Sequence, residues 1–414
     1  MSRQSLLLTS SAIQTAICKF LALTVLFSLL LNGCGATPPS AGETTTTANE
    51  TYFSPAASSP TPVANTPTSS PSPTPAGITS DRDLAVLIED SPDGEVINLA
   101  SGDFILSHGL VINKKLTLVG AGADLTTISG NIPNPDIRAL ITTSGDGALV
   151  LHKLTVEYTG DSPAAVIYLK SGTLEIEDCK ITGATVTESG SQLGAIQLGE
   201  SAAATLRNTT VAGSLNRINP EDPQKIPGGV VLHGNAQLTI DDSTISDSFL
   251  GIYAYGSGVV TARQNTFVNT YAGASFLENS IGTLTGNFFS KSSGVQVATF
   301  DSARLTANEN TLDNSEETIG FQIMEESWAH IEGNSIEGGM SGIFFKDRSG
   351  GEVVGNNIRE FTSSGIYLTD TVAPTLTGNS LHSGKERVIG ILFKGSSQGE
   401  VLDNIIAGVY LGIS

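Results

Sequence analysis

An asparagine recurs with a nearly constant period in the low twenties through the C-terminal part of the chain, and an apolar residue follows it two positions later. Such a period is typical of solenoids, in which each repeat packs only on its neighbours. Asparagine tolerates a left-handed bend and can hydrogen-bond its counterpart in the next repeat, so each is expected at a turn between two strands. In the upstream repeats Cys179, Thr209 and Ser243 occupy this position. The asparagines are Asn265, Asn287, Asn310, Asn334, Asn356, Asn379 and Asn404.

A glycine opens a short apolar segment in each repeat, as in 342–345 (GIFF) and 365–368 (GIYL). Side chains in such a segment alternate between two faces, which is typical of a β-strand. A leucine-rich repeat has a similar period, but its L-x-x-L-x-L-x-x-N pattern is missing here. The repeat therefore predicts an all-β fold, a single-stranded right-handed parallel β-helix solenoid of roughly twelve to thirteen coils, each advancing about 4.8 Å.

The segment before the first repeats predicts a cap for this solenoid. Residues 80–104 read SDRDLAVLIEDSPDGEVINLASGDF, in which a short helix would start at Ser80 with Asp83 as its capping-box partner. Residues 110–130 continue as LVINKKLTLVGAGADLTTISG. Over residues 79–414 the chain resembles the pectate-lyase-like right-handed β-helix family. The resemblance implies the fold and a short N-terminal capping helix, but no single activity, because the family includes lyases, hydrolases, epimerases, binding modules and adhesins.

The part of the chain before Thr79 predicts export and a membrane anchor. Residues 1–33 read as a lipoprotein signal peptide, whose apolar run (20–31) is short for a membrane span. The run ends in a lipobox-like Leu31-Asn32-Gly33-Cys34, so Cys34 would carry lipid; the alternative is an ordinary secretory signal with a chance cysteine. Residues 34–78 are rich in Pro, Ser and Thr and predict a disordered stalk. The expected location is extracytoplasmic, lipid-anchored to a bacterial membrane, in the periplasm or on the cell surface.

Charge and cysteine content exclude two classes of protein. The formal net charge is −20, with 41 acidic and 21 basic residues, which argues against a nucleic-acid partner. Of three cysteines, Cys18 leaves with the signal peptide and Cys34 is assigned to lipid, so Cys179 stands alone and is expected to be a small buried apolar residue. An intramolecular disulfide framework is therefore excluded.

One line of side chains on the outward face of the glycine-initiated strands is a candidate carbohydrate platform. Glutamine and aromatic side chains in a line would hydrogen-bond and stack on sugar rings; the alternative is the ordinary preference of β-sheets for aromatic residues. The candidate residues are Tyr253, Gln296, Gln322, Phe344 and Tyr367.

A column of acidic residues follows the same strands, with one member in each repeat. Stacked like charges are destabilising unless water or a cation screens them. Three interpretations stay open: a solvated edge, a calcium site, or a carboxylate pair for glycoside chemistry. The column consists of Glu278, Asp301, Glu325, Asp347 and Asp370.

Complete catalytic signatures of the resembled family are missing. Asp241-Asp242 follows rather than precedes His233-Gly234, which is the wrong order for the polygalacturonase-type hydrolases, and the five histidines have no metal-ligand spacing. Catalytic residues and metal ligands are therefore not assigned, calcium is the one cofactor considered, and enzyme activity is left undecided. An insertion containing NRINPEDPQKIP (216–227) lengthens one repeat and marks its surroundings, near His233 and Asp241, as the place to look for a site.

These observations predict an extracytoplasmic, lipid-anchored β-helix protein that binds carbohydrate or polysaccharide on one outward sheet face. The first alternative is a polysaccharide lyase or glycoside hydrolase. The second is a structural or adhesive surface rod without catalysis.

Overall fold

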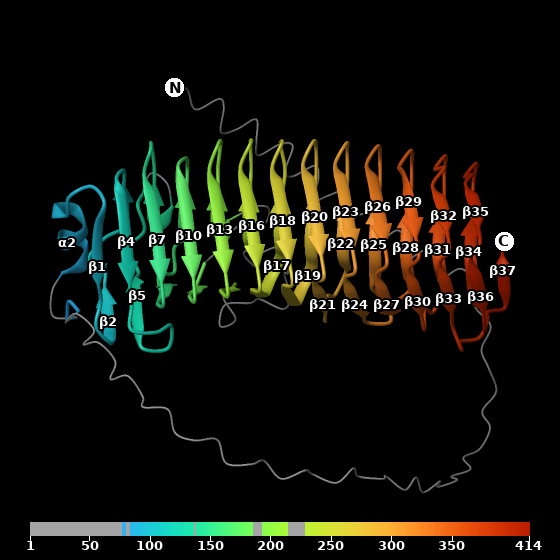
Figure 1. Ribbon diagram of the computed structural model, residues 1–414, viewed down its shortest axis with the longest axis horizontal. Coiled ribbons are helices and arrows are strands. Elements are labelled where there is room, and N and C mark those ends of the chain that lie inside the picture. The colour runs from blue at the N-terminus through green and yellow to red at the C-terminus, as the bar shows by residue number, and fades with distance from the viewer. Residues whose placement is uncertain (1–76, 80–82, 136–137, 185–192, 214–227) are drawn as a thin grey trace, which may run out of the picture. The chain divides into compact units, whose positions relative to one another are not determined.

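The computed structural model describes residues 77–79, 83–135, 138–184, 193–213 and 228–414. Within these ranges the chain is a right-handed parallel β-solenoid with one short helix at its N-terminal end, as predicted (Figure 1). The predicted signal peptide (1–33), Cys34 and nearly all of the predicted stalk (34–78) lie outside the described residues. Ile78, assigned to the stalk, instead pairs with Leu99 at the edge of the solenoid.

Each coil contributes one strand to each of three parallel ladders, which we call the first, second and third sheets. The first sheet has 13 strands. It consists of β1 (Glu95–Asn98), β4 (Lys115–Val119), β7 (Ala148–His152), β10 (Thr173–Glu177), β13 (Ala203–Arg207), β16 (Gln237–Asp241), β18 (Val259–Arg263), β20 (Ile281–Thr285), β23 (Arg304–Asn308), β26 (Trp328–Glu332), β29 (Gly350–Val354), β32 (Thr375–Thr377) and β35 (Glu400–Leu402).

The second and third sheets are continuous with one another, because β17 and β19 are long enough to belong to both. The second sheet consists of β2 (Gly102–Ile105), β5 (Thr126–Gly130), β8 (Thr155–Tyr158), β11 (Lys180–Thr182), β14 (Thr210–Ala212), β17 (Thr244–Ala254), β19 (Thr266–Phe276), β21 (Phe288–Ser290), β24 (Thr311–Asn314), β27 (Ser335–Gly338), β30 (Asn357–Arg359), β33 (Ser380–His382) and β36 (Ile405–Ala407). The third consists of β3 (Leu110–Ile112), β6 (Ala139–Thr143), β9 (Ala165–Leu169), β12 (Gly194–Leu198), β15 (Gly228–Leu232), β17, β19, β22 (Val295–Thr299), β25 (Ile319–Ile323), β28 (Ser341–Phe345), β31 (Ser364–Leu368), β34 (Ile389–Phe393) and β37 (Leu411–Ile413).

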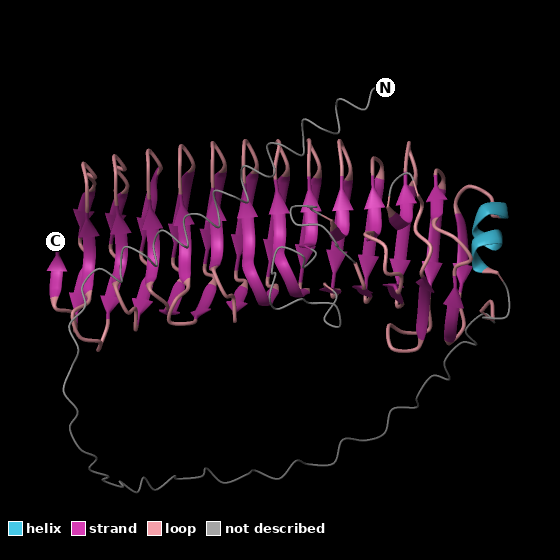
Figure 2. Cartoon of the chain, turned by 180° about the vertical axis from the view of Figure 1, so that it is seen from behind, coloured by secondary structure: helices cyan, strands magenta, loops and turns pink. Residues whose placement is uncertain are grey.

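Helix α2 (Leu84–Asp90) covers the N-terminal end of the solenoid, on the far side of β1 from β4 (Figure 2). Leu84, Ala85 and Ile88 are buried in the same apolar core as the strands. The predicted cap position needs correction, because Asp83 is itself the N-cap: its Oδ1 accepts a hydrogen bond from Ala85 N at 3.0 Å. A carboxylate at this position satisfies an amide that the first helical turn leaves unpaired.

The predicted asparagine ladder is confirmed, and it lies at the turn between the first and second sheets. Asn334 Nδ2 donates to Asn356 Oδ1 and to Ala307 O, both at 2.9 Å, and Asn334 N donates to the same Asn356 Oδ1 at 2.9 Å. The left-handed residue of each turn is not the asparagine, as the sequence suggested, but the residue before it; Gly333 has φ 62°. The asparagine therefore provides hydrogen bonds, while its predecessor provides the bend.

Candidate functional site

The register of the third sheet corrects the predicted carbohydrate platform. If Gly294 is taken as the glycine that opens its strand, Gln296 falls in the outward column. In the structure Val295 pairs with Ile319, so Gln296 lies opposite Gly320, among the glycines that open the neighbouring strands. Ala298 occupies the position aligned with Gln322 instead. The outward column reads Tyr168, Gln197, Val231, Tyr253, Ser275, Ala298, Gln322, Phe344, Tyr367 and Leu392.

Most of the candidate platform is buried, so these side chains offer little surface to a sugar ring. Tyr253, Gln322 and Phe344 are 3%, 8% and 1% exposed, and Gln296 is fully buried. Coils about 4.8 Å apart bring each of these side chains against its counterpart in the next coil. Phe344 packs on Tyr367 with ring centroids 5.0 Å apart. Gln296 is held by Ser292 Oγ, which donates to its Oε1 at 2.6 Å.

The acidic column stacks one residue per coil, and each carboxylate has a structural partner. Glu325 Oε2 accepts a hydrogen bond from Asp301 N at 2.8 Å, and Asp347 Oδ2 accepts one from Glu325 N at 3.3 Å. The five residues have positive φ between 53° and 65°, a conformation that acidic and amide residues tolerate better than most. The column is thus a second ladder of hydrogen bonds, at the turn that follows the third sheet.

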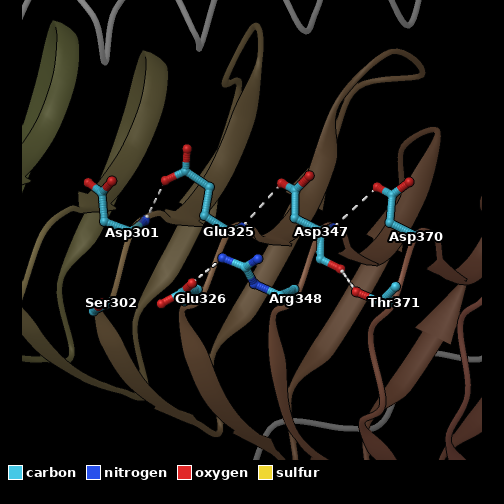
Figure 3. Close-up of a pocket in the computed structure, with 8 residues that line it drawn as sticks. All are labelled: Asp301, Ser302, Glu325, Glu326, Asp347, Arg348, Asp370 and Thr371. Atoms are coloured by element: carbon cyan, nitrogen blue, oxygen red, sulfur yellow. Dashed lines mark hydrogen bonds and ion pairs between the residues drawn. The ribbon is translucent and has the colours of Figure 1, made fainter.

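Four members of this column line a groove of about 720 Å³ (Figure 3). The second row of the groove contains Arg348, which forms an ion pair with Glu326, and Thr371, whose Oγ1 donates to Asp347 O at 2.8 Å. The carboxylates of the column point away from this second row. They therefore form an anionic edge whose oxygens are engaged by main-chain amides.

Calcium does not fit this edge well, because its ligands would have to converge on one point. Among the described residues there is no group of three or more His, Cys, Asp or Glu side chains arranged to hold a metal ion. The carboxylates follow one another along the solenoid instead of surrounding a common centre. The column by itself therefore provides no common centre for a cation, and calcium stays one of the interpretations considered from the spacing.

Three aromatic rings form a row on the N-terminal part of the third sheet. We call it the aromatic row, and its members are Tyr168, His233 and Tyr255. The rings of Tyr168 and His233 are nearly parallel, with centroids 6.4 Å apart, and those of His233 and Tyr255 lie 5.9 Å apart. His233 and Tyr255 each follow the last residue of a third-sheet strand. Tyr253 adds a fourth ring, 5.4 Å from Tyr255.

Glycine makes room for this row. The coil between Tyr168 and His233 has Gly199 at the equivalent position, since Gly199 N donates to Leu169 O and His233 N donates to Leu198 O. A Cβ on Gly199 would lie 2.7 Å from His233 Cε1 and Nε2 and 3.0 Å from Tyr168 Oη. The imidazole therefore occupies space that any other residue at position 199 would fill.

Burial and nearby carboxylates set the protonation of the row. Burial lowers the pKa of His233, and the negative charge of Glu200 partly opposes this shift, so the imidazole is neutral at neutral pH. Burial raises the pKa of Tyr168, with a further contribution from Glu200. Burial also raises the pKa of Tyr255, followed by the effect of Glu278. The row thus presents neutral rings with phenol and imidazole polar atoms, all half-buried.

The sequence identified the vicinity of His233 but not the row itself. Tyr255 and Glu200 were missed because the prediction followed one column of the strand, and both residues lie beyond the end of their strands. Tyr168 lies in that column, on β9, but upstream of the residues that were chosen. The signal available in the sequence was an aromatic residue directly after a third-sheet strand, as at His233 and Tyr255. Asp241, also near the insertion, lies elsewhere: it is on β16 of the first sheet, 3.6 Å from Arg263 Nη1.

The first sheet has its own charged column on its outward side. His152, Glu177, Arg207 and Asp241 follow one another in register. His152 Nε2 lies 3.4 Å from Glu177 Oε2, and a shallow groove of about 110 Å³ lies beside them. Opposite charges alternate at Glu177, Arg207 and Asp241, which is the pairing expected for an exposed sheet surface.

Family models match almost the whole solenoid. Residues 77–298 match a family described as rhamnogalacturonase A/epimerase, pectate lyase-like, and residues 228–381 and 317–414 match the right-handed β-helix region. No curated protein sequence matches the chain. In the described part of the chain, the only helix is far too short to cross a membrane.

Solved structures of low identity share the fold. The periplasmic alginate epimerase AlgG, in a mutant form, superposes with a TM-score of 0.55 at 10% identity, covering 78% of this chain and 83% of AlgG. The pre-mature gene product 12 of bacteriophage phi29 superposes with a TM-score of 0.53 at 12% identity. That match covers 81% of this chain and 55% of the phage protein.

Proposed function

Because the chain belongs to the rhamnogalacturonase A/epimerase, pectate lyase-like family, we propose that it binds carbohydrate on the outward side of its third sheet, at the aromatic row. The row of Tyr168, His233 and Tyr255 carries this proposal. Two further points support it: AlgG, which has the same fold, is by name a carbohydrate enzyme, and the matched family is named for enzymes of this kind.

The chemistry of the row suits sugar recognition. Sugar rings present apolar C–H faces and hydroxyl edges, and they are bound by half-buried aromatic side chains with a few polar groups in fixed places. Tyr168, His233 and Tyr255 combine both properties, since each ring contributes apolar surface and a phenol or imidazole polar atom. Their centroids lie 6.4 and 5.9 Å apart, so the three rings form a continuous surface.

Binding of an oligosaccharide array to the full chain tests the proposal. Tyr255→Ala removes the end of the row and should weaken binding of the best array member at least 10-fold. Tyr410→Ala is the matched control, because Tyr410 is 72% exposed at the far end of the solenoid, and it should bind like the wild type. Equal binding by wild type and Tyr255→Ala would contradict the assignment of the row.

A lyase or hydrolase that uses His233 is the second candidate function. The observation that favours it is the lowered pKa of His233, because a neutral imidazole is available as a general base at neutral pH. Incubation with the bound polysaccharide would then release reducing ends or unsaturated products, and His233→Gln would abolish this release even at concentrations that saturate the weakened binding site. Binding without any product formation would leave the protein as a binding module.

We also propose that the protein is extracytoplasmic and held to a bacterial membrane by lipid on Cys34. The lipobox-like segment and the apolar run at 20–31 support this location. Cys34→Ala should move the protein from the membrane fraction to the soluble fraction of the cell. A membrane-bound Cys34→Ala protein, or an N-terminal peptide without acyl chains by mass spectrometry, would contradict lipid anchoring.

A further inference from the structure

The acidic column has a gap of two coils, and the gap lies beside the aromatic row. Glu200 occupies the same turn as Glu278, but the two coils between them have Gly234 and Gly256 there: Asn235 N donates to Glu200 O, Ser257 N to Gly234 O and Asn279 N to Gly256 O. All four turn residues have positive φ. We call Gly234 and Gly256 the glycine gap.

From Gly256 to Asp347 each main-chain amide of the turn donates to a carboxylate from the next coil, and the column ends at Asp370, which is followed by Gly395 at the same turn. Gly256 N donates to Glu278 Oε2 at 3.0 Å, and Glu278 N donates to Asp301 Oδ2 at 3.1 Å. The same bond recurs in the three following coils, at 2.8 to 3.3 Å. At this turn a main-chain amide thus usually donates to a carboxylate oxygen of the following coil.

Two amides at the gap lack such an oxygen. A Cβ on Gly234 would lie 3.3 Å from Glu200 N, and a Cβ on Gly256 would lie 2.9 Å from Gly234 N. A carboxylate side chain at either position would therefore reach the amide of the preceding coil, but glycine has no side chain. Within the described residues neither Glu200 N nor Gly234 N has a hydrogen-bond acceptor. Both N–H groups are thus free to donate to a ligand oxygen.

The aromatic row borders the gap directly, because His233 precedes Gly234 and Tyr255 precedes Gly256 in the chain. A ligand at the gap would therefore lie next to two amide donors and next to His233 and Tyr255 of the aromatic row. These donors and rings belong to three successive coils, a stretch of about 10 Å along the axis.

Among the described residues, the charged groups around the gap are mainly carboxylates. Glu200 acts on Tyr168 and His233, and Glu278 acts on Tyr255 and Tyr253. The nearest cation in the same column is Lys170, one coil before Gly199 and exposed to solvent. A ligand carboxylate would be repelled by Glu200 and Glu278, whereas a hydroxyl group would donate to them and accept from the amides.

We infer that the glycine gap is a subsite for an uncharged sugar unit, whose hydroxyl groups take the place of the two missing carboxylates. This inference rests on the proposed carbohydrate binding and adds its selectivity: neutral saccharides are bound and uronates are rejected. The main-chain amides of Glu200 and Gly234 donate to the sugar, and the carboxylates of Glu200 and Glu278 accept from it.

Gly234→Asp tests the subsite, because it supplies one of the two missing carboxylates, the one beside Glu200 N. Asp301, Asp347 and Asp370 adopt φ of 53° to 65° at the same turn, so the substitution follows a conformation already present in the chain. Gly395→Asp is the matched control: Gly395 lies at the same turn at the other end of the column, with φ 68° and a Cβ position 3.1 Å from Asp370 N. Circular dichroism and thermal unfolding establish that both variants are folded.

An array that contains uncharged glucans, xylans and galactans beside galacturonan and alginate oligosaccharides gives the result. The wild type should bind an uncharged member at least 10-fold more tightly than any uronate. Gly234→Asp should lose at least 10-fold in affinity for that member, and Gly395→Asp should keep it. Preferential binding of uronates, or wild-type affinity in folded Gly234→Asp, would overturn the subsite and leave carbohydrate binding standing. Failure to bind any member would overturn both.

Discussion

Asn334 Oδ1 accepts two hydrogen bonds from a single residue of the preceding coil, Asn310: one from its main-chain N at 2.8 Å and one from its Nδ2 at 2.9 Å. Both residues are 1% exposed. The amide group of one coil thus serves the main chain and the side chain of another, in a place that water does not reach. This pairing makes the ladder the most sensitive polar element of the solenoid.

Asn334→Ala should therefore destabilise the protein strongly. The substitution leaves two donors of Asn310 buried without an acceptor, which costs about 2 to 4 kcal/mol of the free energy of unfolding. Chemical denaturation followed by circular dichroism measures the loss. Asn404→Ala is the control at the partly exposed end of the ladder and should cost about half as much or less. Equal losses at the two positions would contradict the importance of burial.

The acidic column should be maintained by its acceptor oxygens and not by its charge. Asp347→Asn keeps an oxygen for Glu325 N, tolerates the φ of 64°, and removes one charge from the stack, so its stability should stay within about 0.5 kcal/mol of wild type. Asp347→Ala loses the acceptor and should cost about 1 to 2 kcal/mol. Thermal unfolding compares the two variants.

Calcium addition distinguishes a calcium site in the acidic column from a column whose carboxylates only accept hydrogen bonds from main-chain amides. If the carboxylates serve only main-chain amides, millimolar calcium should raise the unfolding temperature no more than the same ionic strength of sodium chloride. A calcium-specific rise that is lost in Asp347→Asn would instead support the cation site considered from the sequence.

His330 should make stability depend on pH near neutrality. Its Nε2 and Nδ1 lie 3.0 Å from Glu332 and Glu352, and these hydrogen bonds raise its pKa, with Glu332 as the largest cause. Because the folded pKa lies above the unfolded value, the stabilisation is fully present below about pH 6.5 and is lost as the pH rises through the folded pKa. The difference in unfolding temperature between wild type and His330→Gln should shrink from pH 5.5 to pH 8.5.

Gly199→Ala should disturb the aromatic row without disturbing the coil. The added methyl group would lie 2.7 Å from the imidazole, so His233 has to move away from Tyr168. Carbohydrate affinity should fall at least 10-fold, while the circular dichroism spectrum stays unchanged. Gly384→Ala is the control, because a Cβ there meets no atom within 4 Å. Retained affinity in Gly199→Ala would show that the position of the imidazole is unimportant for binding.

The periodic parts of the fold were predictable, because a coil is a short unit whose packing is repeated. The asparagine spacing was enough to predict the ladder, its place at a bend and its bonds from coil to coil. Asp83 was recognised as a capping residue, although its own place in the cap was assigned wrongly.

The error in the predicted carbohydrate platform arose where two positions in the sequence fit the repeat equally well. Gly294 looks like the glycine that opens a strand, yet main-chain pairing places Gln296 opposite Gly320. The spacing of the acidic residues correctly predicted a stack, but a sequence does not show which amide a carboxylate accepts from. The aromatic row was missed because Tyr168 and His233 are distant in the sequence and meet across Gly199, whose alignment requires the pairing of β9 with β12 and of β12 with β15.

The left-handed turn after the third sheet has a consequence for how such proteins change over time. Its main chain keeps the same path whether aspartate, glutamate or glycine fills it. A single codon change at this turn therefore adds or removes an anionic group at one level of the rod while the strands on either side are unaffected. Selection is free to adjust surface chemistry in steps of one coil, so that new recognition properties emerge without a new architecture.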